Sequence, residues 1–287
     1  MRTVLLALLL LGCTSGKSFS PDAGPTNPLV AARPYQYQVP SGYTPSRPFP
    51  LVILLHGYGA SGFLQDAYFG FSPFAASHGL LYAYPDGTLD SSNHRFWNAT
   101  DACCDFGGTG VDDVAYVSAI IDDMNVRFNI DPKRIYILGH SNGGFMAHRL
   151  ACDLSPRIAA IVSLAGDNWK DVTRCRPSQR VAVLQVHGDS DETIPYAGGG
   201  NLPNLPSAHE SVAGWAQLNG CGVTAVSGGT LDVDTSLAGA ETTVERWPNC
   251  TGGAAELWTI RGGTHLPALG ASWPSLVYDF MAAHPKP

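Results

Sequence analysis

The sequence contains little charge. Only 14% of its 287 residues are Asp, Glu, Lys or Arg, and the formal net charge is −7. Like charges do not form runs at any point of the chain. Nucleic acids and anionic membrane surfaces are bound through clusters of Lys and Arg. The composition therefore argues against a nucleic acid or an anionic membrane surface as the partner of this protein.

Long hydrophobic runs are equally scarce. Residues 4–11 are almost wholly aliphatic but too short to span a bilayer, and no second run of this kind follows. With Arg2 before it, the run has the form of an export signal. It ends in Leu-Leu-Gly-Cys13, which resembles a bacterial lipoprotein signal; the alternative is a plain secretory signal. We therefore predict a signal at residues 1–13 and an exported protein, extracellular or periplasmic, with a lipid anchor on Cys13 as its only membrane attachment.

The chain also lacks the spacing of a metal site, because its cysteines and histidines form neither a Cys-x-x-Cys pair nor a mixed cluster. We expect no metal and no organic cofactor. Seven cysteines in an exported protein point instead to disulfides. Cys103 and Cys104 are adjacent, so they either bridge each other or pair elsewhere. Besides Cys13 and this adjacent pair, the cysteines are Cys152, Cys175, Cys221 and Cys250.

The rest of the chain has the pattern of one α/β domain. Residues 14–33 are rich in Ser, Gly, Pro and Asn and predict a flexible linker before a catalytic domain at 34–287. Continuous apolar runs, typical of strands buried on both faces, alternate with helical patterns, which predicts a doubly wound and mostly parallel sheet. We expect strands at 35–39, 49–55, 80–84, 135–138, 158–164, 181–186, 242–247 and 256–260, and helices at 112–128, 142–154, 210–218 and 273–283.

One pentapeptide carries the strongest chemical signal. Gly-His-Ser141-Asn-Gly follows a predicted strand and precedes a predicted helix. This is the context of the Gly-x-Ser-x-Gly nucleophile elbow of the α/β-hydrolase fold, in which small residues flank a strained serine. The alternative is a glycine-rich turn without chemistry. The strand before the motif and the helix after it favour Ser141 as a nucleophile.

A serine hydroxyl needs a base, and the base needs an orienting acid. In this fold the acid and then the histidine follow the serine along the chain. His265 lies in the loop after the last predicted strand and is the predicted base. Asp189 and Asp191 both follow the strand that ends near His187. An aspartate directly after a glycine commonly closes a local turn, so we predict Asp191 as the acid.

The reaction also needs two N–H donors for the developing oxyanion. One donor belongs to the residue after the nucleophile, Asn142. The other is expected in His-Gly-Tyr58-Gly, directly after the buried run at 49–55, where the glycines let the backbone approach a substrate. We predict the N–H groups of Tyr58 and Asn142 as the oxyanion hole.

These motifs together resemble a known family. From about Pro34 to the C-terminus the chain is similar to the secreted polyhydroxybutyrate depolymerase, feruloyl esterase and acetylxylan esterase family of α/β-hydrolases. The motifs that carry the resemblance are Leu54-Leu-His-Gly57, Tyr84-Pro-Asp-Gly87, Phe96-Trp-Asn98, Cys103-Cys104, Val111-Asp-Asp-Val114, Gly139-His-Ser-Asn-Gly-Gly144, His187-Gly-Asp-Ser-Asp-Glu-Thr-Ile-Pro-Tyr196 and Gly262-Gly-Thr-His265.

The resemblance implies the same triad, Ser141, Asp191 and His265, with oxyanion donors on Tyr58 and Asn142. It implies that Trp97 lies near the acyl pocket; the alternative is a core aromatic. It also implies disulfides Cys152–Cys175 and Cys221–Cys250, which leaves Cys103–Cys104 as a vicinal bridge. The chain departs from the family pattern at Leu266, where members carry an aromatic wall beside the base. We expect Leu266 to contact the substrate, and aromatic acyl groups are less strongly implied.

The sequence thus predicts an exported serine carboxylic-ester hydrolase that works through an acyl-enzyme. The resemblance implies as substrate a plant-wall ester, feruloyl or acetyl, or a polyester of the polyhydroxyalkanoate type, so that the partner is an ester, small or polymeric. The alternatives are a serine peptidase of the same fold and a non-catalytic polymer-binding lipoprotein. The sequence carries no signal for an oligomeric state.

Overall fold

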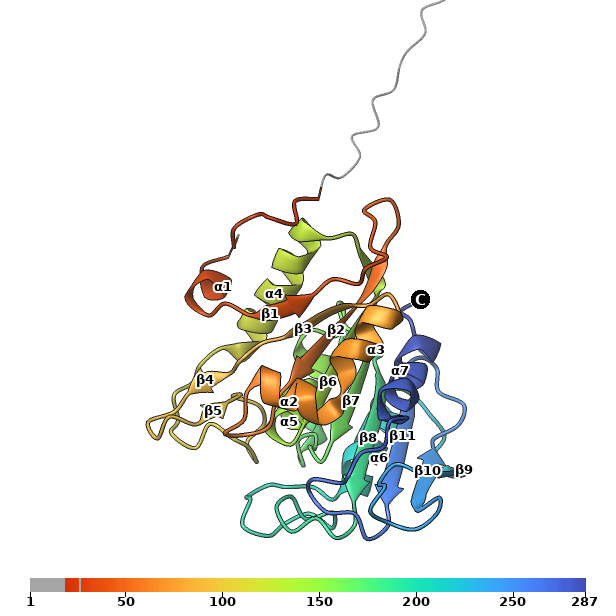
Figure 1. The fold of residues 1–287 in the computed structure, drawn as a ribbon. Coiled ribbons are helices and arrows are strands. Elements are labelled where there is room, and N and C mark those ends of the chain that lie inside the picture. The colour runs from red at the N-terminus through yellow and green to blue at the C-terminus, as the bar shows by residue number, and fades with distance from the viewer. Residues whose placement is uncertain (1–18, 26) are drawn as a thin grey trace, which may run out of the picture.

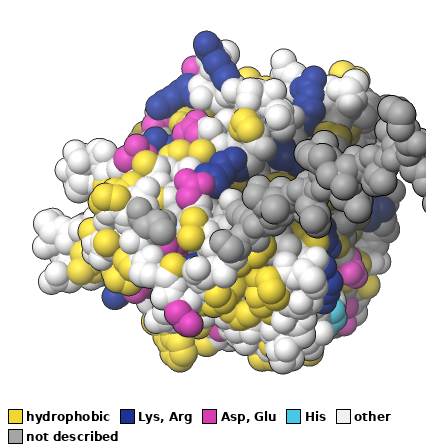
Figure 2. All heavy atoms as spheres, turned by 90° about the horizontal axis from the view of Figure 1, so that it is seen from above, with side chains coloured by type: hydrophobic (Ala, Val, Ile, Leu, Met, Phe, Trp, Pro, Cys, Tyr) yellow, Lys and Arg dark blue, Asp and Glu magenta, His cyan; other side chains and the backbone are white. Residues whose placement is uncertain are grey.

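The computed structural model describes residues 19–25 and 27–287. The predicted signal at 1–13, with Cys13, lies outside the described residues. Within the described part of the chain, no helix is long and apolar enough to cross a membrane. On the face shown in Figure 2, acidic and basic side chains are interspersed among uncharged ones, in keeping with the low charge of the sequence.

A nine-stranded sheet forms the centre of the molecule, in the order β1-β3-β2-β6-β7-β8-β11-β10-β9 (Figure 1). The strands from β3 to β11 in this order run parallel, whereas β1, β10 and β9 pair antiparallel at the two edges. The sheet strands are β1 Gln36–Gln38, β2 Phe49–Leu55, β3 Leu81–Tyr84, β6 Ile130–His140, β7 Ala160–Leu164, β8 Ala182–Gly188, β9 Val226–Leu231, β10 Thr242–Arg246 and β11 Ala255–Ile260, and β4 Thr88–Leu89 with β5 Arg95–Phe96 forms a separate ribbon.

Helices cover both faces of this sheet and bury two hydrophobic clusters (Figure 1). Phe145 and Trp215 of α5 and α6 belong to the cluster on one face, while Phe71 and Trp273 of α3 and α7 belong to the other. The predicted doubly wound, mostly parallel α/β domain is therefore confirmed. The helices are α1 Pro28–Ala32, α2 Gly62–Phe69, α3 Phe71–Ser77, α4 Asp113–Arg127, α5 Asn142–Asp153, α6 Ala208–Leu218 and α7 Trp273–Ala283, with a 3-10 turn η1 at Val172–Arg174.

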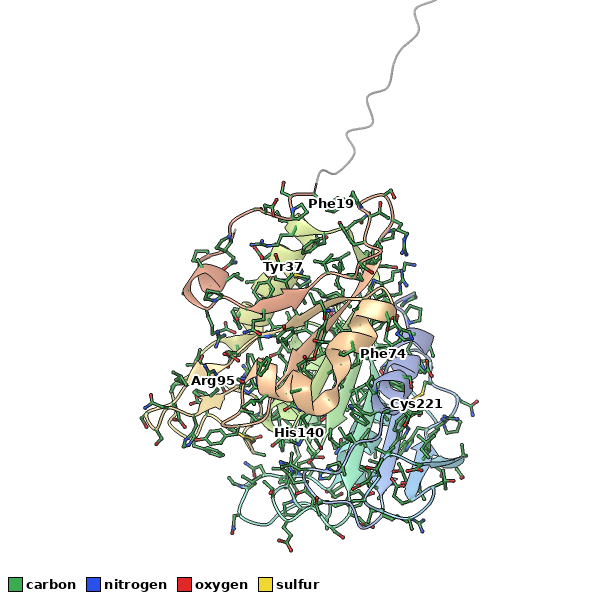
Figure 3. All side chains as sticks on the ribbon, viewed as in Figure 1. Phe19, Tyr37, Phe74, Arg95, His140 and Cys221 are labelled. Atoms are coloured by element: carbon green, nitrogen blue, oxygen red, sulfur yellow. A yellow bond between two sulfur atoms is a disulfide. The ribbon has the colours of Figure 1, made fainter. Side chains whose placement is uncertain are left out.

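The carboxyl ends of the central strands lie where the motifs predict the active site. All seven residues of β2 are buried, as are the last six of β6, because helices lie on both sides of these strands. In the parallel register Leu55 lies beside Gly139, and His140 lies beside Leu164. The carboxyl ends of β2, β6 and β7 therefore meet at one edge, which is the lower end of the sheet where Figure 3 labels His140.

The segment before the domain is more ordered than its composition predicts. Within the expected linker at 14–33, Pro28–Ala32 forms α1, capped by the side chain of Asn27. Val30 is buried against the core, and Arg33 lies 2.7 Å from Asp113 at the start of α4. Proline at the first helical turn and an Asn cap favour a helix even in a polar segment. The packed part of the chain thus begins before residue 34.

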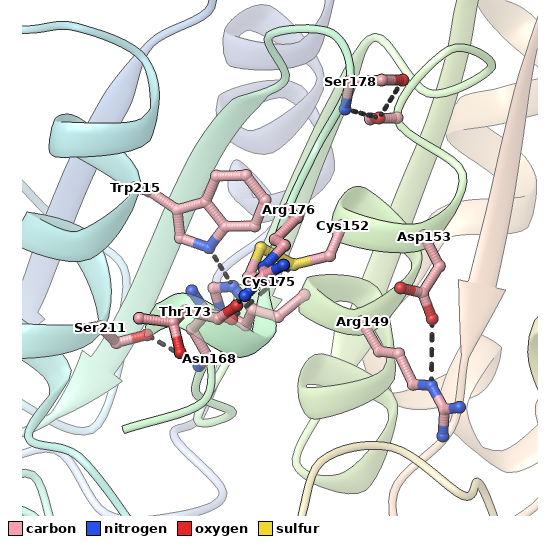
Figure 4. Close-up of a disulfide and its surroundings, with 12 residues drawn as sticks. Arg149, Cys152, Asp153, Asn168, Thr173, Cys175, Arg176, Ser178, Ser211 and Trp215 are labelled. Carbon is pink, nitrogen blue, oxygen red and sulfur yellow. Dashed lines mark hydrogen bonds and ion pairs between the residues drawn. A yellow bond between two sulfur atoms is a disulfide. The ribbon is translucent and has the colours of Figure 1, made fainter. Parts of the chain in front are cut away.

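Three disulfides join described residues, and they are the pairs that the family resemblance implies: Cys103–Cys104, Cys152–Cys175 and Cys221–Cys250. Figure 4 shows how Cys152–Cys175 ties α5 to the segment after η1. The second long-range pair ties the end of α6 to the connection between β10 and β11. Two of the three bridges therefore fasten loops to the sheet framework.

Candidate active site

Ser141 sits on a tight turn between β6 and α5. Its φ is 53° and its ψ is −122°, a backbone conformation that residues other than glycine rarely adopt. The turn allows no side chain on its flanks, because a methyl group on Gly139 would overlap the carbonyl of Gly143, and one on Gly143 would overlap the carbonyl of Leu55. The Gly-x-Ser-x-Gly spacing is thus a steric requirement of this turn.

His265 lies in the loop between β11 and α7, and its Nδ1 is 2.8 Å from Oδ2 of Asp191. The other carboxylate oxygen of Asp191 accepts hydrogen bonds of 2.8 Å from the N–H groups of Thr193 and Ile194. Burial alone would raise the pKa of Asp191, but hydrogen bonds from His187 and His265 outweigh it and hold the pKa well below its ordinary value. The carboxyl therefore stays ionised.

Ser141 and His265 line one pocket of about 280 Å³. Its mouth is largely apolar, and Leu266, next to His265, is 62% exposed there. The low volume lies near the lower end of the range for small-molecule sites. The pocket is lined by Gly57, Tyr58, Ala60, Leu64, Gln65, Tyr68, His140, Ser141, His265 and Leu266.

The loop after β2 presents the Tyr58 N–H beside this pocket. Gly57 N donates to Gln65 Oε1 at 3.2 Å and Gly59 N donates to Arg95 O at 2.8 Å. Within the described part of the chain, the Tyr58 N–H has no acceptor. Burial lowers the pKa of His56 to about 4, so its neutral ring donates from Nδ1 to Gly57 O and accepts at Nε2 from another backbone N–H. These bonds hold the loop in place, and among the described residues the backbone N–H of Tyr58 is left without an acceptor.

Asn142 begins α5, where backbone N–H groups have no acceptor within the helix. Its side chain is clasped by the backbone of Trp97: Oδ1 accepts from Trp97 N at 2.7 Å, and Nδ2 donates to Trp97 O at 2.9 Å. This pair of bonds ties the first turn of α5 to the backbone of residue 97 and occupies both ends of the side-chain amide of Asn142. The motif around Asn142 predicts a role for its backbone N–H only, since a long-range side-chain contact leaves no local pattern in the sequence.

Trp97 is not a substrate contact. Its side chain is fully buried in the core cluster, and its indole N–H donates to His56 O at 3.0 Å. A ring without exposed surface cannot touch a bound acyl group. The structure therefore corrects the expectation of an acyl-pocket residue in favour of the core alternative.

His140 and Asp189 hold the loop of His265 in place, a role that the sequence motifs did not indicate for either residue. Burial lowers the pKa of His140 to about 3, so its neutral ring donates from Nε2 to His265 O at 3.0 Å. Asp189 reaches across the same edge, where its Oδ1 accepts from Gly262 N at 2.6 Å. The loop of Asp191 and the loop of His265 are thus joined by this bond and by Ser190 N, which donates to Gly263 O at 3.0 Å, besides the contact between Asp191 and His265.

Metal-binding groups of three or more His, Cys, Asp or Glu are absent among the described residues. This edge of the sheet brings together the hydroxyl of Ser141, the imidazole of His265 and the carboxylate of Asp191. Residues 34–175 match the sequence family described as esterase PHB depolymerase. The chain belongs to this esterase family.

Family relatives cover most of the chain at low identity. Feruloyl esterase B of Piromyces equi is 29% identical over 251 residues, which cover 84% of this chain and 44% of that protein. Feruloyl esterase D of Neurospora crassa is 25% identical over 272 residues, which cover 90% of this chain and 82% of that protein. The chain thus spans less than half of feruloyl esterase B, and 43% and 22% of two further esterase relatives.

The fold agrees with the family. Acetyl xylan esterase from Aspergillus awamori superimposes with a TM-score of 0.62 at 15% identity, over 86% of this chain and 92% of its own. Esterase PE8 has a TM-score of 0.59 at 16% identity, over 87% and 98% of the two chains. The predicted α/β-hydrolase fold is confirmed.

Proposed function

We propose that the protein is an exported serine carboxylic-ester hydrolase that works through Ser141, His265 and Asp191. One observation carries the proposal: the strained Ser141 lines the same pocket as His265, whose far ring nitrogen is 2.8 Å from the ionised Asp191. This arrangement supplies a nucleophile, a base and an orienting acid for acyl transfer.

The reaction runs in two steps. Ser141 Oγ attacks the ester carbonyl carbon while Nε2 of His265 accepts the hydroxyl proton, and the alcohol then leaves with that proton. The resulting acyl-enzyme is attacked by water in the same manner, which releases the acid and restores Ser141. The N–H groups of Tyr58 and Asn142 stabilise the oxyanion, and each such donor contributes about 3 kcal/mol to the transition state.

As substrate we propose a plant-wall ester, feruloyl or acetyl, or a polyester of the polyhydroxyalkanoate type. The names of the relatives support this class, and so does an apolar pocket rim formed by Tyr58, Leu64 and Leu266. An exposed apolar rim favours a chain or surface that extends past the pocket. The pocket itself accommodates a short acyl group.

A substrate panel tests this proposal. We expect kcat/KM for p-nitrophenyl acetate and butyrate to exceed that for the laurate by about tenfold or more, because a twelve-carbon chain outgrows a pocket of about 280 Å³. Methyl ferulate, acetylated xylan and polyhydroxybutyrate are then compared as natural-type substrates. Cleavage of a peptide p-nitroanilide without ester hydrolysis would identify a peptidase instead.

We further propose that export ends in lipidation of Cys13, on the basis of the Leu-Leu-Gly-Cys13 sequence. In a bacterial host, radioactive palmitate should label the wild-type protein and leave Cys13→Ser unlabelled. Ser141→Ala serves as a control that keeps the label. Release of unlabelled wild-type protein into the medium would show a plain secretory signal.

A further inference from the structure

A fully buried histidine lies directly behind the proposed acid. His187 is in β8, and its Nε2 is 2.9 Å from Ile194 O and 3.4 Å from Oδ2 of Asp191. That carboxylate oxygen is also the one that lies 2.8 Å from Nδ1 of His265. Two histidines, one buried and one at the pocket, therefore meet on a single oxygen atom.

The side chain of Gln185 fixes which nitrogen of this buried ring carries the proton. Gln185 and His187 lie two positions apart on β8 and so share one face of the sheet. The amide nitrogen of Gln185 is 2.5 Å from Asp167 Oδ1 and 3.3 Å from Nδ1 of His187. Because an amide nitrogen only donates, Nδ1 is the acceptor and the ring's Nε2–H points at Ile194 O and Asp191.

Asp167 is itself held in a buried polar pocket after β7. Burial raises its pKa to about 6. The neighbouring Asn168 N donates to Ser211 Oγ at 2.9 Å, a contact drawn in Figure 4. The polar chain from Asp167 through Gln185 to His187 is thus anchored on β7, β8 and α6.

The charges around His187 come from several elements. Asp167 and Asp191 face it with negative charge, His140 and His265 are the neighbouring titratable rings, and the ring of Tyr196 packs edge-on at 5.6 Å. Burial would lower the pKa of His187, but its contacts with Asp191 and Asp167 outweigh it and raise the pKa. In either protonation state, Nε2 of His187 carries a hydrogen toward Asp191.

We propose that His187 is a positioning residue whose Nε2–H, oriented by Gln185 and Asp167, holds Oδ2 of Asp191 against His265. This inference rests on the proposed function. Without the donor, Oδ2 is bound by His265 alone, so the carboxylate is more basic and less restrained in rotation. A more basic partner stabilises the imidazolium of His265, so that at low pH a smaller fraction of His265 is in the neutral form that can accept the proton of Ser141.

Two polar variants separate this role from packing. The amide nitrogen of His187→Gln reaches the place of Nε2, whereas that of His187→Asn falls short of it. We expect His187→Asn to lower kcat for p-nitrophenyl acetate about tenfold or more and to move the acidic midpoint of the kcat/KM profile upward by about half a pH unit, with little change in KM. His187→Gln should keep kcat within about threefold and the midpoint of the wild type.

A buried asparagine near the opposite end of β8 provides the control for packing. Asn219 is equally buried, and its Nδ2 donates to Val181 O at 2.8 Å and to Ala254 O at 2.9 Å, just before β8 and β11 begin. Asn219→Ala should lower the thermal midpoint of unfolding and leave the acidic midpoint of activity in place.

Folded His187→Asn with wild-type kcat and pH profile would overturn the inference. Equal losses in His187→Asn and His187→Gln, or an equal shift of the acidic midpoint in Asn219→Ala, would overturn it as well. Each of these results leaves the wild-type esterase activity intact. Failure of the proposed function shows itself differently, as a wild-type protein that hydrolyses none of the esters.

Discussion

Ser141→Ala lowers kcat for p-nitrophenyl acetate by at least about 10⁴-fold and leaves only the residual rate that the oxyanion donors and substrate binding supply. Only the attacking oxygen is removed, since the Ser141 side chain makes no capping hydrogen bond to α5. Alanine fits the same turn because it is smaller than serine. The variant should therefore keep its fold and its thermal midpoint while it loses activity.

The control for this variant is Ser77→Ala, which removes an exposed hydroxyl at the end of α3. Its kcat should equal that of the wild type. Stoichiometric labelling with a serine-reactive phosphonate, seen as a mass increase in wild type and Ser77→Ala but not in Ser141→Ala, identifies the nucleophile directly. Retained turnover by a folded Ser141→Ala would remove this serine from the mechanism.

Asp191→Asn is expected to lower kcat by about 10⁴-fold. The N–H groups of Thr193 and Ile194 require an acceptor, so the amide oxygen takes the place of Oδ1 and the amide nitrogen faces His265. A donor at that position forces His265 to carry its proton on Nε2, where the ring cannot accept the proton of Ser141. Kinetics on p-nitrophenyl acetate at several pH values measure the effect.

Asp189→Asn is the matched comparison, two residues away in the same loop. The asparagine oxygen still accepts from Gly262 N, so this bond between the two loops persists. We expect kcat within about threefold of the wild type. Comparable losses at both positions would show that the acid has been assigned to the wrong residue.

Much of the fold and the site could be predicted because the signals are local. The apolar run Phe49–Leu55 predicts a strand buried on both faces, and the structure has this strand. The helices that follow residues 112 and 141 begin where the sequence of their first turns indicates. The Ser141 turn was predictable because its glycines are demanded by contacts within a few residues and with the neighbouring strand.

The features that the sequence concealed depend on distant partners. Strand β9 contains Gly228 and Gly229 and is not apolar; its pairing with β10 makes it a strand. The short helices α2 and α3 pack one after the other without a long periodic stretch. The sequence is compatible with Trp97 in the core or at the pocket, since the choice depends on where its indole packs, and its indole N–H bonds His56 O, 41 residues away. Propensity and spacing carry no information about such contacts.

The clasp between Trp97 and Asn142 has a consequence for protein engineering. Asn142 supplies the proposed oxyanion donor through its backbone, and its side chain takes both hydrogen bonds from the backbone of Trp97. The loop between β5 and α4 is therefore not an independent module that can be exchanged to broaden the substrate range. Any insertion or deletion there also displaces the donor beside Ser141, so loop libraries should keep the backbone at residue 97 fixed.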